Sequence, residues 1–303
     1  INAGLFVDVK RVKEMDVDGI GLYRTELPYM LSAHFPDVES QRKTYAKVMR
    51  QAGGKKVLFR TFDIGGDKPL PYFEVADEEN PAMGWRATRI GLDRPAILRR
   101  QFRALIAAGA GRRLDVMLPF ISTVEEIDHA KDLFNRELAR AASYGQTLPS
   151  AIRTGVMIEV PSMLWQIGDL KGKVDFASIG SNDLLQFLYA ADRGNPRLTD
   201  RYDILSPVCL RVFRELVADC EAIGLELSFR GEAAPKLLEA MALIGIGLRS
   251  LSFSASSIGR IKAMVRSLDM SALVEYMDYL CTLPNQSVRT RLSHFARDHG
   301  VMI

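Results

Sequence analysis

The chain has 303 residues, of which 48% are hydrophobic and 25% are charged. This composition is typical of a globular protein and excludes a disordered tail, a collagen-like fibre and a small disulfide-stapled protein. Forty Lys and Arg against 37 Asp and Glu leave a formal charge of +3, which is far below the basic surface that generic nucleic-acid binding requires.

Several locations and partners are excluded in the same way. No apolar run approaches the roughly 18 residues of a membrane span, and the first residues lack the layout of a secretory signal. The sequence therefore predicts a cytoplasmic protein that binds neither a membrane nor nucleic acid. The cysteines are too far apart for a CxxC pattern and are expected to be reduced structural thiols: Cys209, Cys220 and Cys281.

Short apolar runs alternate with helical patterns along the chain. A helical pattern at residues 5–15 precedes the first run. Continuous apolar runs predict strands buried on both faces. These seven runs lie at residues 19–26, 56–66, 114–121, 155–162, 174–183, 225–232 and 248–256.

The segments between the runs carry helix signals. The clearest helix is expected after Ile121, where Ser122 or Thr123 can cap the start and Gly145 ends the pattern. Further helices are expected over residues 37–51 and from Asn80–Pro81 onward. The tail, residues 270–303, predicts two short helices that are broken at Pro284–Asn285.

This alternation predicts an α/β fold with a parallel sheet covered by helices. A (β/α)8 TIM-type barrel is favoured over a large doubly wound sheet. Because the chain opens with a helical pattern, its first strand is expected to be truncated, and seven runs plus one make eight. No linker or internal repeat interrupts residues 1–303, so a single domain is expected.

Polar side chains close most of the apolar runs. In a parallel barrel the carboxyl ends of all strands meet on one rim, so these side chains would converge there to form a site. They are Arg24, Glu26, Arg60, Asp63, Glu159, Asn182, Asp183, Arg230 and Glu232.

Each of these residues also has a plainer explanation. A charged residue at a strand end is often a solvated flank or half of a surface ion pair. Asp183 could be the N-cap of a helix that begins at Leu184. Glu159 is different, because it lies inside an apolar run and needs a partner there. Two carboxylates without a neighbouring His or Cys are ligands suited to Mg²⁺, or alternatively Mn²⁺.

Basic residues complement the two acids. Guanidinium groups bind phosphate and carboxylate oxygens with two hydrogen bonds, so a small phosphorylated acid is the expected ligand. The loop at Gly65–Gly66 is either a phosphate cradle or a plain turn. The candidate cations are Arg24, Arg60, Lys68, Arg86 and Arg193. Trp85 and the methionines Met83, Met117, Met157 and Met163 are expected to pack in the core.

Several segments together resemble one known family. They are RTE at 24–26, FRTFDIGGDKPLPYF at 59–73, NPAMGWRATRIGLDRP at 80–95, VMLPFIS at 116–122, GVMIEVPS at 155–162, DFASIGSNDLLQFLYAADRGNP at 175–196 and SFSASSIGRIK at 252–262. In order and spacing they resemble the C-terminal phosphoenolpyruvate-binding domain of enzyme I, the phosphoenolpyruvate-protein phosphotransferase of the bacterial phosphotransferase system. The phrases EVPSMLWQ, SNDLLQFL and EAMALIGIG are more similar to the nitrogen-regulatory paralogue than to the sugar-transport form.

The resemblance implies a TIM-type barrel that binds phosphoenolpyruvate and Mg²⁺, forms a homodimer and releases pyruvate. The phosphoryl group would pass to a histidine on a separate N-terminal domain and then to a phosphocarrier protein. By position, Glu159 and Asp183 match the family's metal ligands. Residues that match its substrate-binding positions are Arg24, Arg60, Arg86, Arg193, Asn182 and Lys68.

The sequence departs from the family's pattern in two places. None of the four histidines has the family's phosphohistidine context, so the chain is expected to bind phosphoenolpyruvate without becoming phosphorylated on histidine by itself. Where the family has the cysteine of a CGE triplet, the acid that protonates the enolate carbon of pyruvate, this chain has Arg230 before Gly231 and Glu232. Arginine keeps its proton up to about pH 12 and is a poor donor to carbon. Turnover is therefore expected to be impaired.

Two other functions stay open beside phosphoryl transfer. A catalytically silent module that senses phosphoenolpyruvate or supplies a dimer interface would explain Arg230. A reaction of phosphoenolpyruvate and pyruvate like that of pyruvate phosphate dikinase would use a similar barrel and metal.

Overall fold

A computed structural model describes residues 1–30, 32, 34–66, 70, 72–73, 78–198, 201–284 and 286–303. Eight strands form one sheet in chain order, from β1 to β8. They are β1 (Asn2–Ala3), β2 (Gly19–Arg24), β3 (Lys56–Arg60), β4 (Arg113–Leu118), β5 (Ala151–Ile158), β6 (Phe176–Gly180), β7 (Glu226–Arg230) and β8 (Leu251–Ser252).

Helices connect successive strands. They are α1 (Phe6–Arg11), α2 (Glu26–Met30), α3 (Val38–Gln51), α4 (Thr88–Asp93), α5 (Pro95–Ala108), α6 (Val124–Ser143), α7 (Ser181–Leu188), α8 (Pro207–Ala222), α9 (Leu237–Gly245), α10 (Ile258–Arg266), α11 (Met270–Thr282) and α12 (Arg289–Asp298). Short 3₁₀ helices cover Pro81–Met83, Pro161–Trp165, Gly168–Leu170 and Ala255–Ser257. None of the helices in the described part of the chain combines the length and apolar character that a membrane crossing requires.

This strand order is the one predicted for a (β/α)8 fold. Strands β1 to β5 pair in parallel with their sequence neighbours, and so do β7 and β8. The first strand is the two-residue segment Asn2–Ala3, which the sequence pattern did not reveal and which completes the count of eight. Two elements are shorter than expected, because β8 keeps only two residues of the run at 248–256 and α1 ends at Arg11.

The chain divides into two compact units. Unit 1 comprises residues 1–157 and 172–176, and unit 2 comprises residues 158–171 and 177–303. The single domain expected over residues 1–303 stays a prediction, and each unit is described by itself.

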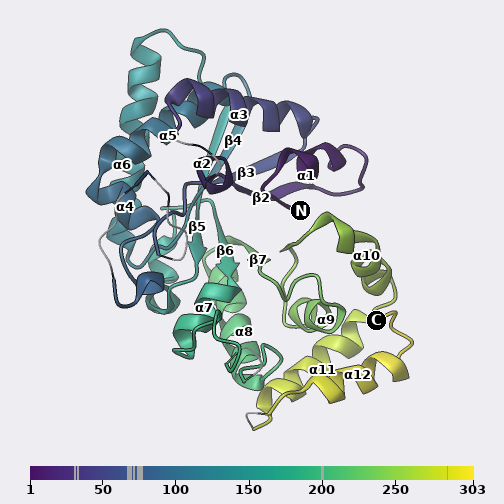
Figure 1. Ribbon diagram of the computed structural model, residues 1–303. Helices are drawn as coiled ribbons and strands as arrows, with labels where there is room; N and C mark the ends of the chain where they lie inside the picture. The colour runs from purple at the N-terminus through teal and green to yellow at the C-terminus, as the bar shows by residue number, and fades with distance from the viewer. Residues whose placement is uncertain are drawn as a thin grey trace. The chain divides into compact units, whose positions relative to one another are not determined.

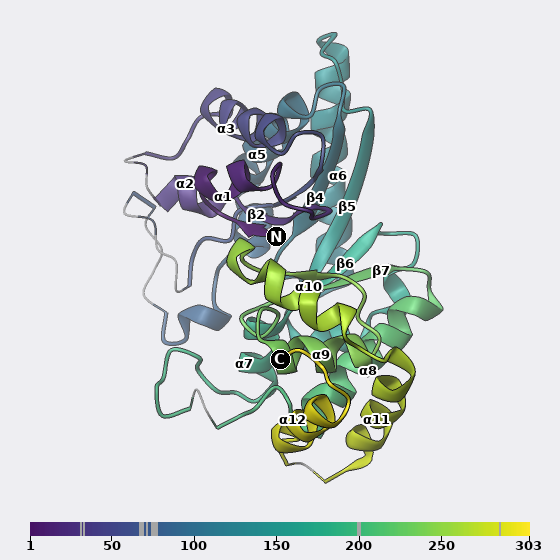
Figure 2. The same cartoon turned by 90° about the vertical axis from the view of Figure 1, so that its right-hand side faces the viewer.

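Unit 1 holds the strands up to β5 and the first six helices. Helix α3 packs against α5, and α5 packs against α6, so that these helices lie outside the strands (Figures 1 and 2). The cap expected at Thr123 is present as a capping box with Glu126, and the structure adds a cap at the start of α3, where the Asp37 carboxylate accepts from Ser40 N at 2.7 Å. The helix expected from Asn80–Pro81 is instead a 3₁₀ turn, and α4 begins at Thr88.

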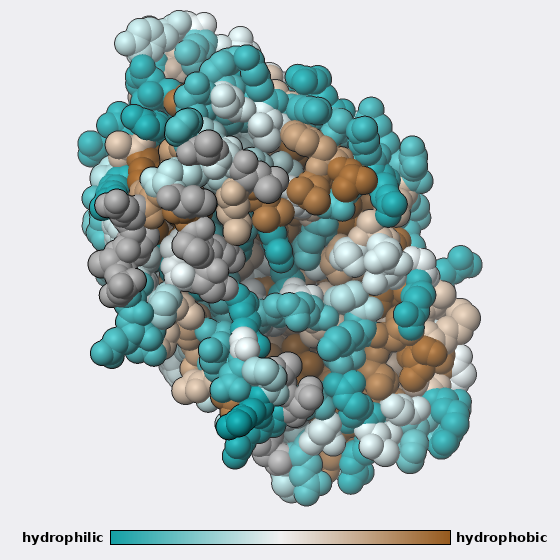
Figure 3. All heavy atoms as spheres, viewed as in Figure 1, coloured by the Kyte–Doolittle hydropathy of each residue, from teal (hydrophilic) through white to brown (hydrophobic). Residues whose placement is uncertain are grey.

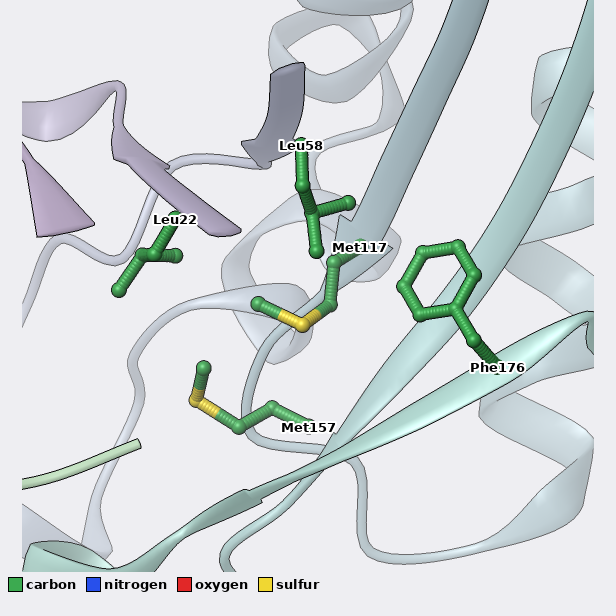
Figure 4. Packing of buried hydrophobic residues seen from close by; sticks show 5 residues of the cluster. All are labelled: Leu22, Leu58, Met117, Met157 and Phe176. Carbon is green, nitrogen blue, oxygen red and sulfur yellow. The ribbon is translucent and has the colours of Figure 1, made fainter. Parts of the chain in front are cut away.

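The core of unit 1 lies between its strands. Five side chains from consecutive strands point toward one another, each at most 3% exposed (Figure 4). Burial of side chains of this size contributes about 1.5–3 kcal/mol each. The Phe176 ring lies directly on Gly155, where any Cβ would be 2.1 Å from the ring, so the core requires a glycine at 155. The five side chains are Leu22, Leu58, Met117, Met157 and Phe176.

Unit 2 holds β7, β8 and most of β6. Helix α11 packs against α8 and α9, while α10 and α12 also pack against α9. The tail forms α11 and α12 as expected; of the predicted break, Pro284 lies between them and Asn285 lies outside the described residues.

Most residues expected in the core are buried. The three cysteines are buried free thiols, and Met117, Met157 and Met163 are at most 3% exposed. Met83 is an exception, since it ends a 3₁₀ turn and is 56% exposed. Hydrophilic residues predominate on the face shown in Figure 3, with smaller apolar groups between them.

Candidate functional site

Arg60 is the last residue of β3 and is buried in an ionic cluster. Its Nη2 lies 3.1 Å from Asp63 Oδ2 and also donates to Glu26 Oε1. All three side chains are at most 7% exposed. A buried guanidinium is tolerated only when carboxylates compensate its lost hydration, so Glu26 and Asp63 hold Arg60 in one position.

Arg86 shares the same carboxylate. Its Nη2 lies 2.9 Å from Asp63 Oδ1, and its guanidinium carbon lies 4.5 Å from the centre of the Phe120 ring. Arg86 is completely buried. Asp63 therefore joins two of the predicted ligand residues, Arg60 and Arg86, within unit 1.

The Gly65–Gly66 loop packs closely on the segment that carries Arg86. A Cβ on Gly65 would lie 2.5 Å from Trp85 O, and one on Gly66 would lie 2.6 Å from Pro81 O. Both glycines also have positive φ, at +89° and +60°. This close approach explains the glycine pair without a phosphate. Lys68, predicted to contact the ligand, lies outside the described residues.

Arg24 is the register partner of Arg60 in the pairing of β2 with β3, but its side chain forms no ion pair with this cluster among the described residues. It is the last residue of β2 and is exposed, whereas the next residue, Thr25, is buried and donates from Oγ1 to Arg60 O at 2.8 Å. Of the three predicted arginines in unit 1, the structure thus joins Arg60 and Arg86 through one carboxylate.

The two predicted metal ligands both belong to unit 2. Glu159 follows β5 directly and is 1% exposed; Asp183 lies in the first turn of α7, just after β6, and is 8% exposed. Asp183 is not the N-cap, since Gly180 holds that position. Two buried carboxylates at the ends of neighbouring strands are the hard oxygen donors that suit Mg²⁺, so the residues fit such an ion. Among the described residues, no group of three or more His, Cys, Asp or Glu could hold a metal.

Arg193 and Asn182 lie beside Asp183. Arg193 Nη1 is 3.3 Å from Asp183 Oδ2, and Asn182 Oδ1 accepts from Glu232 N at 3.3 Å. Asn182, Arg193 and Glu232 line one cavity of unit 2, with a volume of about 1240 Å³. The structure thus places Arg193 against Asp183, next to a cavity that Asn182 also lines.

Arg230, the last residue of β7, is only 5% exposed. Its carbonyl accepts from Ser181 Oγ at 3.1 Å, and a Cβ on the following Gly231 would lie 1.9 Å from that same oxygen. The close packing requires glycine at 231. It fixes Arg230 beside the start of α7, which carries Asn182 and Asp183.

A second ionic network lines the same cavity and escaped the sequence analysis. Arg289 Nη2 lies 2.9 Å from both Asp203 Oδ1 and Glu239 Oε1. Burial would raise the pKa of Asp203, but hydrogen bonds from Arg289 and Ser287 outweigh it and lower that pKa. Since 86 residues separate Asp203 from Arg289, no local pattern could have paired them.

Tyr189 also lines this cavity. Burial raises the pKa of its hydroxyl to about 12, so it is a neutral hydrogen-bonding group at physiological pH. It stacks on Tyr202 with ring centres 4.5 Å apart.

Eight parallel strands in chain order, with helices between them, define the class of (β/α)8 barrel proteins, whose sites lie at the carboxyl ends of the strands. Residues 1–270 match the family described as "PEP-utilising enzyme, PEP-binding domain", and the chain belongs to this family.

Three named relatives support the assignment of the chain to this family. The chain is 40% identical over 273 residues to the "Phosphoenolpyruvate-dependent phosphotransferase system" protein of Salmonella typhimurium, covering 89% of this chain and 36% of that protein. It is 39% identical to the "Phosphoenolpyruvate-protein phosphotransferase" of Latilactobacillus sakei, covering 91% of this chain and 48% of that protein. It is 34% identical to the "Multiphosphoryl transfer protein 1" of Escherichia coli over 99% of this chain and 36% of that protein. The chain thus spans less than half the length of these relatives.

Two solved structures are similar in fold. A malate synthase from Haloferax volcanii, solved as a complex with pyruvate and acetyl-CoA, aligns with a TM-score of 0.53 at 10% identity, over 96% of this chain and 76% of that one. An aldolase/citrate lyase family protein from Burkholderia cenocepacia aligns with a TM-score of 0.51 at 14% identity, over 90% and 92%. These likenesses and the strand order confirm the predicted barrel fold class.

Proposed function

We propose that the chain binds phosphoenolpyruvate with Mg²⁺ and serves phosphoryl transfer from it to a histidine on a separate N-terminal domain, with release of pyruvate. The observation that carries this proposal is the buried cluster in which Asp63 holds both Arg60 and Arg86. The family match and the names of the relatives agree with it.

The arginines would bind the ligand's anionic groups. Because Arg60 and Arg86 are already fixed by Asp63, little reorganisation is needed when a phosphate or carboxylate arrives. Arg24, Lys68, Asn182 and Arg193 would supply further contacts. Their contribution is to hold the phosphoryl group in line with its acceptor and to neutralise its charge.

Glu159 and Asp183 would hold the metal ion. Mg²⁺, or Mn²⁺ in its place, supplies positive charge to phosphate and carboxylate oxygens. Arg193, 3.3 Å from Asp183, would give up part of this contact when a cation binds to the carboxylate.

Arg230 would slow the last step. A guanidinium holds its proton too tightly to give it to the enolate carbon, so protonation to pyruvate is left to water. The burial of Arg230 favours a second candidate, a catalytically silent module that binds phosphoenolpyruvate as a sensor.

The partners are part of the proposal. The names of two relatives refer to a phosphotransferase system and to multiphosphoryl transfer, which supports an N-terminal phosphohistidine domain and a phosphocarrier protein as partners. A homodimer and the nitrogen-regulatory branch are the further elements that the sequence resemblance implies.

Calorimetry with phosphoenolpyruvate tests binding. We expect saturable binding that needs Mg²⁺ and is lost in Asp183→Asn. The matched control Asp169→Asn removes an exposed carboxylate of the same unit and should bind like the unchanged chain. If the unchanged chain shows no binding with Mg²⁺ present, the proposal fails.

Deuterium exchange into the methyl group of pyruvate distinguishes the phosphoryl-transfer function from the silent sensor module. We expect slow exchange by the unchanged chain and faster, Mg²⁺-dependent exchange by Arg230→Cys. Phosphohistidine on an added N-terminal domain would establish transfer, whereas binding without exchange or transfer in either form would establish the silent module.

A further inference from the structure

A second cavity lies in unit 1, at the amino ends of strands β3 and β4. It has a volume of about 620 Å³ and is bounded by the end of α3, the starts of β3 and β4, and the turns that precede them. Lys56 and Arg113, the first residues of β3 and β4, are both part of its wall. Nothing in the proposed phosphoryl transfer uses it.

The wall of this cavity is strongly basic. It contains a single acidic side chain, Asp115, and an apolar part formed by Met49 and Val57. Five basic side chains against one carboxylate leave an excess of four positive charges, more than the +3 of the entire chain. The basic residues are Arg50, Lys55, Lys56, Arg112 and Arg113.

Packing accounts for part of this charge. Arg113 lies with its Nε 2.8 Å from Asp115 Oδ1, and Lys55 Nζ donates to Val12 O at 2.9 Å and to Met15 O at 2.6 Å. The carbonyls fix the position of Lys55 but carry no net charge, and the ammonium forms no ion pair with any residue in the described part of the chain.

Arg50 and Arg112 have no such structural role. Both are exposed, and neither guanidinium forms an ion pair with any residue that the structure describes. Arg50 lies in the last turn of α3, where the helix dipole favours a cation. Arg112 lies in a turn before β4, and that explanation does not apply to it.

We propose that this cavity binds a small anion that carries two or more phosphate groups. Cations gathered around a concave surface reinforce one another's field and attract multiply charged anions. Guanidinium forks from Arg50 and Arg112 match phosphate oxygens, and the lysines add point charges. A small molecule is favoured over nucleic acid because the charge is confined to one cavity of a chain with little net charge.

The cavity is distinct from the proposed phosphoenolpyruvate site. Arg60 ends the strand that Lys56 begins, and the five residues of β3 span about 13 Å at the usual rise per residue. Failure of the phosphoenolpyruvate proposal would therefore leave this one intact.

Calorimetric titration with inorganic pyrophosphate tests the proposal on the full chain. We expect saturable binding at low salt that is at least tenfold weaker in the double variant Arg50→Gln/Arg112→Gln. The control Arg100→Gln removes an exposed arginine of α5 in the same unit and should leave the affinity unchanged. Thermal melting of all three chains verifies that they fold alike.

The outcomes separate cleanly. Equal affinity of the double variant and the unchanged chain would place pyrophosphate elsewhere and overturn the proposal, as would the absence of saturable binding. Weakening in Arg100→Gln to the same degree would show a general effect of charge and would also overturn it.

Discussion

The cations at the two ends of strand β3 differ in burial and in pairing with carboxylates. At its carboxyl end, Arg60 and Arg86 are 6% and 0% exposed, and each contacts the carboxylate of Asp63. Around its amino end, five cations line a cavity with one carboxylate, and Arg50 and Arg112 are exposed.

The difference follows from what water supplies. A buried guanidinium loses its hydration and must have a carboxylate partner, which also fixes its direction. An exposed guanidinium keeps its hydration, so it can stay unpaired and flexible at little cost. At the carboxyl end the arginines are thus held in fixed directions, whereas at the amino end Arg50 and Arg112 stay hydrated.

Removal of the carboxylate that Arg60 and Arg86 share is expected to lower the free energy of unfolding the most. Asp63→Asn removes the carboxylate that the buried Arg86 contacts at 2.9 Å, while Glu26 still compensates Arg60. We expect the free energy of unfolding to fall by about 3 kcal/mol, measured by urea denaturation.

Asp115→Asn is the matched control. Asp115 is as buried as Asp63, but its partner Arg113 is 47% exposed and can turn to water. We expect a loss of about 1 kcal/mol. Equal losses in the two variants would contradict the idea that burial of the arginine sets the cost.

Glu137 on α6 tests an intermediate case. Its side chain is fully buried, whereas its partners Arg99 and Arg103 are 42% and 31% exposed. We expect Glu137→Gln to lower the free energy of unfolding at neutral pH by about 2 kcal/mol, between the two preceding variants. Urea denaturation measures it.

The same residue predicts a dependence on pH. Burial would raise the pKa of Glu137, but hydrogen bonds from Arg103 and Arg99 outweigh it and lower the pKa below 4.5. A lowered pKa in the folded state adds stability above the unfolded value of 4.5, and this stability is lost as the pH falls through the folded value. The difference between the unchanged chain and Glu137→Gln should therefore shrink below pH 4.5. A difference that stays constant down to pH 3 would show that the charge of Glu137 is not responsible.

Much of the fold was readable from the sequence because its signals are local. The capping residues after Ile121 predicted the start of α6, and the helix predicted over residues 37–51 corresponds to α3, which begins at Val38. The two-residue β1 gave no signal, since a strand so short shows no periodicity. The prediction that Met83 packs in the core was wrong, because a 3₁₀ turn places this residue outside the core.

The sequence identified individual residues of the site but not the contacts between them. Arg60, Glu159 and Asp183 were identified at the ends of apolar runs and Arg86 as a further cation, and all four are buried. Their partners were harder, since Asp63 joins Arg86 across 23 residues. The contact of Arg86 with the ring of Phe120, a residue with a positive φ of 55°, is likewise not indicated by any hydrophobic pattern.

Arg112→Gln tests the amino end of β3 and is expected to change the free energy of unfolding the least. This arginine is exposed and forms no ion pair within the described residues, so its removal breaks no contact and lowers the repulsion among the cations of the cavity. We expect the free energy of unfolding to stay within about 0.5 kcal/mol of the unchanged chain, with any change toward higher stability at low salt. Urea denaturation at low and high salt measures this. A loss comparable to that of Asp63→Asn would mean that Arg112 is held by the fold, and the contrast between the two ends of the strand would then disappear.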